Sequence, residues 1–232
     1  PSPLSAGEFY LRQARTLIRV LDARTDAGFV FRVDMRLRPY GDSGPLVASF
    51  TAFEDYLQAD GRDWERYAYV KARALTGRAV YEPLREQVLR PFVYRRYLDF
   101  GVFDSLREMR ALIAREVQRR DLADHVKLGP GGIREVEFTV QSLQLIRGGQ
   151  DPNLRDTSLL AVLPRLRGAK LLGDEAIEQL RSAYLFLRRL ENRLQMLDDQ
   201  QTHSLPSDPL SLLRIARAMD LDDETGLRAV LD

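Results

Sequence analysis

Hydrophobic and polar residues alternate strictly along residues 30–38, a pattern typical of a β-strand. The alternation places four charged residues on one face of that strand: Arg32, Asp34, Arg36 and Arg38. The other face is apolar, and we expect it to pack against a core. Pro39 ends the ladder, and residues 40–44 (Tyr-Gly-Asp-Ser-Gly) predict a turn.

The rest of the pattern is mostly helical. Ser5 and Glu8 predict a capping box at the start of a helix that runs to about residue 21. A second helix is predicted to begin at Ser49 or Thr51 and to end before Gly61. It is followed by a helix to about residue 69 and a short extended piece. Later apolar spacings of three and four residues predict helices over 82–91, 102–121, 132–148, 157–168, 174–200, 208–219 and 223–231.

These elements predict an α+β chain that is mostly α. A small α/β part is expected over residues 1–80 and an all-helical part over residues 81–232. The chain begins with Pro1, so we expect it to be part of a longer protein.

Composition excludes several kinds of protein and site. The 232 residues include no cysteine and two histidines, which rules out disulfides, thiolate metal sites and a histidine-rich metal centre. The net charge of +1 argues against a nucleic-acid-binding surface. No apolar run is long enough to span a membrane, and we expect a cytoplasmic protein. Most cations are arginines, which is usual in a protein from a GC-rich genome.

The charged face of residues 30–38 suggests phosphate chemistry. Three guanidinium groups with one carboxylate lie close together on a strand and repel one another unless anions compensate them. A polyphosphate would do so through bidentate arginine contacts, with Asp34 placed to hold a divalent metal ion. A solvated edge strand with an Asp–Arg ladder explains the same spacing equally well.

Residues 127–147 are the second unusual stretch. Gly131 and Gly132 precede a helix, where backbone N–H groups can bind an anion. Glu137 lies at the border of the apolar stripe of that helix and needs a partner. Lys71 and Arg73 are further candidates for binding the polyphosphate expected at the charged face of residues 30–38. Alternatively, these are a glycine-rich helix start, a structural ion pair and two solvated cations.

Five segments in this order resemble glutamine synthetase adenylyltransferase, a bifunctional enzyme that also removes adenylyl groups. They are 33–44 (Val-Asp-Met-Arg-Leu-Arg-Pro followed by Gly-Asp-Ser-Gly), 64–66 (Trp-Glu-Arg), 70–73 (Val-Lys-Ala-Arg), 131–138 (Gly-Gly-Ile-Arg-Glu-Val-Glu-Phe) and 185–192. The resemblance covers most of the chain. The variants in the first and fourth segments resemble the N-terminal, adenylyl-removing copy of the family's two nucleotidyltransferase domains.

The resemblance implies the C-terminal part of a polymerase-β-like nucleotidyltransferase domain followed by a helical bundle. In such an enzyme, phosphate releases ADP from adenylyl-tyrosine on glutamine synthetase, and the other domain uses ATP to attach AMP. Asp34 matches the third carboxylate of a two-metal magnesium site, and Arg36 and Arg38 match its catalytic companions. The weaker phosphate- or nucleotide-binding candidates are Arg32, Lys71, Arg73, Gly131, Gly132 and Glu137.

One departure from the family pattern concerns the first two metal-binding carboxylates. The only Asp-x-Asp triplet with an apolar centre is Asp220-Leu-Asp222, which lacks the expected Gly-Ser turn and does not open a strand. We therefore expect the pair to lie upstream of Pro1, and we expect this chain alone to be inactive. Two alternatives remain open. One is a helical docking module for glutamine synthetase and the signalling protein PII, and the other is a related enzyme such as PII uridylyltransferase.

Overall fold

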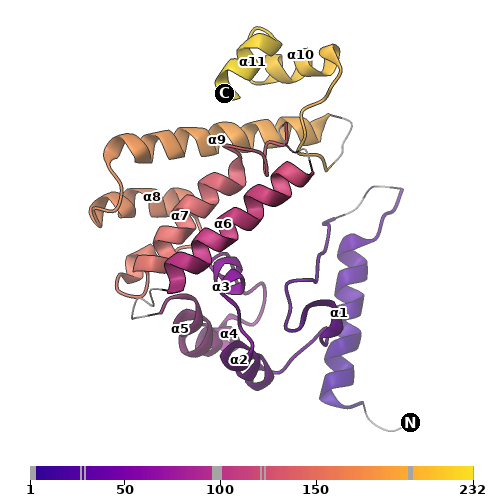
Figure 1. The fold of residues 1–232 in the computed structure, drawn as a ribbon. Helices are drawn as coiled ribbons and strands as arrows, with labels where there is room; N and C mark the ends of the chain where they lie inside the picture. The colour runs from indigo at the N-terminus through magenta and orange to yellow at the C-terminus, as the bar shows by residue number, and fades with distance from the viewer. Residues whose placement is uncertain are drawn as a thin grey trace. The chain divides into compact units, whose positions relative to one another are not determined.

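The computed structural model describes residues 4–26, 28, 30–95, 101–120, 122, 124–197 and 201–231. Over these residues the chain is mostly helical, as predicted (Figure 1). It divides into two compact units. Unit 1 comprises Pro1–Glu65 and Gly77–Phe92, and unit 2 comprises Arg66–Thr76 and Val93–Asp232. None of the helices in the described ranges is both long and apolar enough to cross a lipid bilayer.

The first part of the chain forms one long helix, α1 (Ala6–Asp22), and the shorter helices α2 (Phe50–Ala59), α3 (Asp63–Tyr69), α4 (Arg78–Leu84) and α5 (Arg90–Val93). The predicted capping box is present at α1, where Ser5 Oγ accepts from the Glu8 amide and the Glu8 carboxylate accepts from the Ser5 amide. Pro83 lies inside α4, and a π-helical turn over Arg85–Leu89 follows directly. A proline has no amide hydrogen to donate, which disturbs the regular ladder at this point.

The predicted strand over residues 30–38 is wrong as a strand. Residues 31–36 form no ladder, and across the described residues the structure contains two isolated bridges, Thr25 with Gly28 and His125 with Ser204. Instead, the Phe31 amide donates to the Leu21 carbonyl (2.8 Å) and the Val33 amide to Asp22 Oδ1 (3.0 Å). Alternation produces a strand only where a neighbouring strand supplies backbone partners, and the end of α1 supplies just these two acceptors.

The apolar face of this segment is also not a core, contrary to prediction. Phe31 is 64% exposed and Leu37 is 66% exposed. Val33 and Met35 are half-buried. A face with no opposing layer has nothing to bury its side chains.

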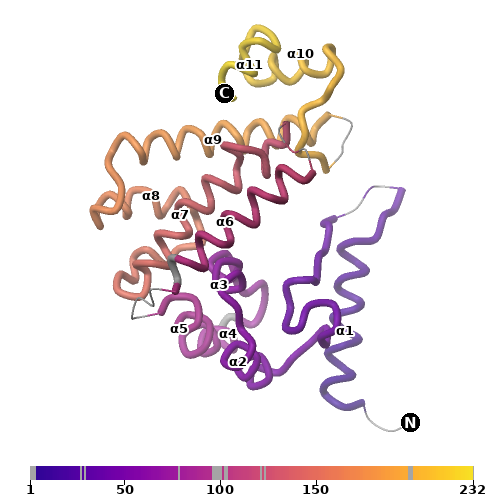
Figure 2. Tube along the Cα trace, viewed as in Figure 1, coloured from indigo at the N-terminus to yellow at the C-terminus, as the bar shows by residue number. Residues whose placement is uncertain are grey.

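Unit 2 contains the remaining helices: α6 (Gly101–Arg119), α7 (Ile133–Arg147), α8 (Leu159–Gly168), α9 (Asp174–Met196), α10 (Pro209–Ala218) and α11 (Glu224–Leu231). Each corresponds to a predicted helix within a few residues. The last residue of the predicted helix 102–121 and the last three of the predicted helix 174–200 lie outside the described residues. Figure 2 traces the path from α6 to α11. The core forms between α7, α8, α9 and α10, where the most deeply buried side chains include Val140, Leu163, Leu166, Leu190 and Ile215.

Candidate functional site

Asp34 and Arg36, predicted as catalytic residues, form one ion pair in unit 1. Arg36 Nη2 donates to Asp34 Oδ2 (2.6 Å), and Arg36 Nε lies 3.0 Å from both carboxylate oxygens. The Arg36 amide also donates to Asp34 Oδ1 (3.0 Å). Side-chain and then backbone hydrogen bonds from Arg36 lower the pKa of Asp34 to about 2. Both side chains are exposed, so the pair presents an ionised carboxylate and a guanidinium group to solvent.

Arg38 does not share the carboxylate partner of Arg36. Its guanidinium group turns back onto the following loop and donates to the backbone oxygens of Met35 (2.6 Å), Gly44 (3.3 Å) and Asp42 (3.3 Å). The loop reverses through Tyr40 and Gly41, whose φ angles are 60° and 57°. The Arg38 side chain is only 18% exposed, so it holds the loop in place.

The same loop is tied to the helices of unit 1 by aromatic residues. The rings of Tyr40 and Tyr56 lie 4.7 Å apart, and the Tyr56 hydroxyl donates to Glu65 Oε1 (2.7 Å). The Glu65 carboxylate is buried and also accepts from the Arg62 amide (2.9 Å). Burial, followed by the hydrogen bond to Glu65, raises the pKa of Tyr56 to about 12. Glu65 is therefore a structural member of the Trp-Glu-Arg segment.

Unit 2 contains a second charged cluster, centred on Glu137. Its Oε1 accepts from Arg188 Nη2 (2.9 Å) and Lys71 Nζ (3.4 Å), and the Tyr184 hydroxyl lies 3.5 Å away. Arg188 Nη1 also donates to Glu191 Oε2 (2.7 Å). Burial lowers the pKa of Arg188, but the hydrogen bonds to Glu191 and Tyr184 outweigh it and leave that pKa raised.

Two histidines extend this cluster on the far side of Glu191. His203 Nδ1 lies 3.0 Å from Glu191 Oε1 without hydrogen-bond geometry. His125 Nδ1 accepts from the Leu128 amide (3.0 Å). Burial is the largest cause that lowers the pKa of each histidine, and the positive charge of Lys127 adds to it. Both imidazoles are therefore neutral near pH 7.

The structure thus brings Lys71 and Glu137 together but does not bring every weaker candidate to them. Arg73 forms no ion pair with any of the described residues. The Gly131 amide already donates to Glu135 Oε2 (3.0 Å), and the Gly132 amide to the Gly129 carbonyl (3.0 Å). An anion at these two amides would have to displace an acceptor that the chain provides. Arg32, in unit 1, has interactions of its own.

A magnesium ion at Asp34 stays a prediction. Within the described residues, no group of three or more acidic or histidine side chains is placed to hold a metal ion. Both oxygens of Asp34 are bound by Arg36. Asp34 is therefore paired with Arg36 in this structure.

Sequence reasoning missed the roles of Arg188, Glu191 and Glu65. Arg188 lies on α9, and its partner Glu191 is on the same helix. Its spacing of three residues from Glu191 was the available signal, because such pairs face each other on a helix. No local pattern indicates the contact between Arg188 and Glu137, which are 51 residues apart.

Two family models match the chain. Residues 2–87 match glutamate-ammonia ligase adenylyltransferase. Residues 107–231, more than half of the chain, match GlnD PII-uridylyltransferase. The chain belongs to the nucleotidyltransferases of the adenylyltransferase and PII-uridylyltransferase type. The first match contains Asp34 and Arg36, and the second contains Glu137 and Arg188.

Proposed function

We propose that the chain acts in the reversible adenylylation of glutamine synthetase, in the half that removes the adenylyl group. The observation that carries the proposal is the match of residues 2–87 to glutamate-ammonia ligase adenylyltransferase, since glutamate-ammonia ligase is glutamine synthetase. The exposed pair of Asp34 and Arg36 lies within that match. The Gly-Asp-Ser-Gly variant at residues 41–44 supports the adenylyl-removing assignment.

In the proposed reaction, phosphate is the nucleophile. One phosphate oxygen attacks the phosphorus of the adenylyl group, the bond from that phosphorus to the tyrosine oxygen breaks, and ADP leaves. The tyrosine oxygen takes up the proton that the attacking hydrogen phosphate loses, so that the step balances. No side-chain nucleophile is needed, so the protein contributes charge and positioning.

The residues of unit 1 have separable roles in this proposal. Arg36 is exposed and can exchange its carboxylate partner for a phosphate, because guanidinium groups bind either anion in the same bidentate way. Asp34 holds Arg36 in place until the phosphate arrives. Arg38 shapes the loop and does not touch the substrate.

A direct binding measurement tests this proposal. We expect ADP or phosphate, titrated calorimetrically into the chain, to bind less tightly to Arg36→Gln than to the wild type, by about tenfold for one lost charged contact. Arg181→Gln is the matched control, because Arg181 is an exposed arginine of α9 with an acidic partner three residues away. Equal ADP binding by wild type and Arg36→Gln would contradict a phosphate-binding role for the pair.

A docking role is the second candidate, and the match to GlnD PII-uridylyltransferase over residues 107–231 favours it. We propose that the helices of unit 2 bind PII and glutamine synthetase. The test is sedimentation of the chain with PII and, separately, with glutamine synthetase. Complex formation that survives Arg36→Gln would support docking by the helices, whereas the absence of both complexes would reject it.

A further inference from the structure

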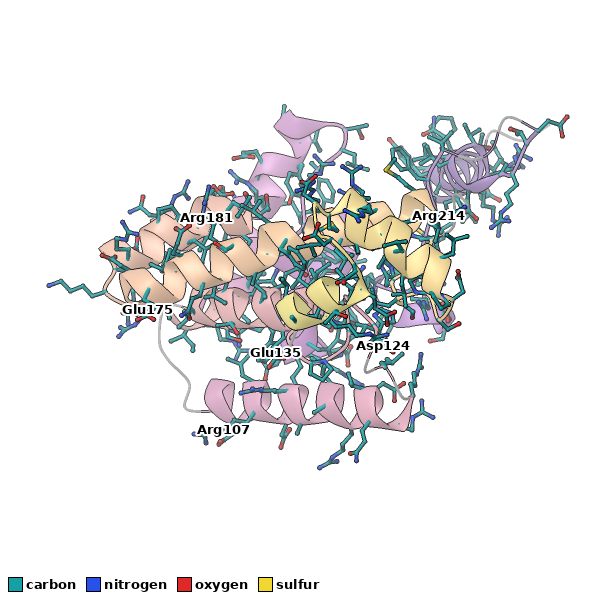
Figure 3. All side chains as sticks on the ribbon, turned by 90° about the horizontal axis from the view of Figure 1, so that it is seen from above. Arg107, Asp124, Glu135, Glu175, Arg181 and Arg214 are labelled. Carbon is teal, nitrogen blue, oxygen red and sulfur yellow. The ribbon has the colours of Figure 1, made fainter. Side chains whose placement is uncertain are left out.

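A cavity of about 770 Å³ lies between α6 and α7 in unit 2. Figure 3 shows α6, marked by Arg107, with Glu135 of α7 on the side of α7 that faces it. Both helices and the segment before α7 contribute apolar side chains to its walls, among them Ile113, Val117, Leu122, Leu128, Phe138 and Leu143. Cavities of this size and character typically take small organic ligands.

Few polar groups line the cavity, and Ser142 and Arg134 are among those without a side-chain partner in the described part of the chain. Ser142 Oγ is buried and has no hydrogen-bond partner among the described residues. A buried hydroxyl without a partner is unfavourable, so this one indicates an acceptor supplied from outside the chain. The guanidinium group of Arg134 forms no ion pair within the described part of the chain.

The other charged groups at the cavity neutralise each other. Arg110 Nη2 lies 3.2 Å from Glu135 Oε1, and Glu135 Oε2 accepts from the Gly131 amide. The net unpaired charge at the cavity is therefore the positive charge of Arg134. This sign favours an anion over a cation.

We propose that the cavity binds a small amphipathic anion. Its apolar body lies between α6 and α7, its negatively charged group contacts Arg134, and an acceptor on its body takes the hydrogen bond from Ser142. The proposal concerns a separate ligand site and does not depend on the function proposed above.

Calorimetric titration of alkyl carboxylates tests the proposal. We expect decanoate to bind saturably with one site per chain, and each added CH₂ group to tighten binding about fourfold. Arg134→Gln should weaken decanoate binding about tenfold, whereas Arg107→Gln, an exposed arginine of α6 outside the cavity, should not change it. Decyltrimethylammonium, with the same chain length and the opposite charge, should bind more weakly than decanoate.

Variants that fill the cavity locate the site. Ile113→Trp should abolish decanoate binding, and circular dichroism should show that its helix content is unchanged. If Ile113→Trp does not fold, Ala114→Phe is the alternative variant that fills the cavity. An added hydroxyl, as in 10-hydroxydecanoate, should strengthen binding to the wild type and lose that advantage in Ser142→Ala.

Several results would overturn the proposal. The proposal fails if decanoate shows no saturable binding, or if decyltrimethylammonium binds as tightly as decanoate. It also fails if Ile113→Trp binds decanoate as tightly as the wild type does. Sedimentation equilibrium tests whether a second copy of the chain occupies the cavity instead of a small ligand. A wild-type dimer that Ile113→Trp dissociates would assign the cavity to a second copy of the chain, and would also overturn the small-ligand proposal.

Discussion

Replacing Arg188 with methionine tests whether the charged cluster of unit 2 holds its helices together. Arg188 lies on α9 and bonds Glu137 of α7 at 2.9 Å and Glu191 of α9 at 2.7 Å. Its Nε also donates to the Tyr184 hydroxyl (3.2 Å). Methionine keeps the apolar length of the side chain and removes all three contacts. The change therefore isolates the charge of Arg188 from its packing.

The magnitude follows from burial and from the partners that remain. Removing one member of a fully buried ion pair costs about 3–5 kcal/mol because the other charge is left uncompensated. The side chains of Glu137 and Glu191 are 18% and 8% exposed, but that of Arg188 is 36% exposed, so the full penalty does not apply. Glu137 also keeps Lys71 at 3.4 Å. We expect a loss of about 2–3 kcal/mol in the free energy of unfolding, or about 5–10 °C in Tm.

Urea unfolding followed by far-ultraviolet circular dichroism measures this loss. Arg181→Met is the matched control on the same helix. Arg181 pairs with Glu178 at 3.2 Å, with both side chains more than half exposed, so its loss should cost less than about 0.5 kcal/mol. A double-mutant cycle of Arg188→Met with Glu191→Gln should give a coupling energy of about 1–2 kcal/mol. If Arg188→Met costs no more than Arg181→Met, the reasoning is refuted and the cluster is an ordinary surface network.

Three further predictions concern single groups. The pKa of Asp34 is lowered to about 2 in the folded chain. The ionised carboxylate therefore contributes to stability above the pKa that Asp34 has in the unfolded chain, and this contribution is lost as the pH falls through about 2. Carboxyl NMR titration should find Asp34 ionised at pH 3 in the wild type and its pKa close to the usual value of about 4 in Arg36→Gln. Tyr56→Phe should lower the free energy of unfolding by about 1.5–3 kcal/mol, because the buried carboxylate of Glu65 loses a 2.7 Å hydrogen bond; a change below about 0.5 kcal/mol in urea unfolding would count against this role. The pKa of His203 is lowered mainly by burial, so its contribution to stability is present above about pH 6.5 and is lost as the pH falls; His203→Phe should flatten the pH dependence of Tm between pH 7 and pH 5, and an unchanged slope would contradict it.

The helices could be predicted from the sequence because each carries its own signals. Ser5 with Glu8 sets the start of α1, and Asp208 caps α10 through a 2.8 Å bond from the Ser211 amide. The leucine spacing of α9 places Leu187, Leu190 and Leu194 in the core. Capping and the helical period are local properties, so no knowledge of the tertiary structure is needed to find them.

The segment around Asp34 could not be predicted in the same way. Its alternation is real, but a strand also depends on neighbouring strands that the local pattern does not describe. The pairing of Asp34 with Arg36 could be predicted because the two residues are close in sequence. The contact of the Arg38 side chain with the 40–44 loop could not be predicted, because the path of that loop depends on the left-handed backbone at Tyr40.

The charged cluster of unit 2 shows a second limit of sequence reasoning. Glu137 was recognised as a carboxylate that needs a partner, and the structure supplies Arg188 and Lys71 from two distant segments. The buried carboxylate of Glu137 is on α7 and the guanidinium group that compensates its charge is on α9, so the two meet only because α7 packs against α9. The residue in need of a partner could be predicted, whereas the identity of the partner could not.

The residues that carry the family resemblance therefore fall into two physical classes. The side chains of Arg38 and Glu65 are largely buried, and they form hydrogen bonds with other groups of the chain. Asp34 and Arg36 are exposed and bonded mainly to each other, which is an arrangement that an incoming phosphate can exchange at little structural cost. Substitutions in the first class should lower stability and reduce ligand binding only through unfolding. Substitutions of Asp34 or Arg36 should alter ligand binding and leave the unfolding transition unchanged. Ligand titration and urea unfolding of the same variants therefore distinguish residues that bind the ligand from residues that stabilise the fold.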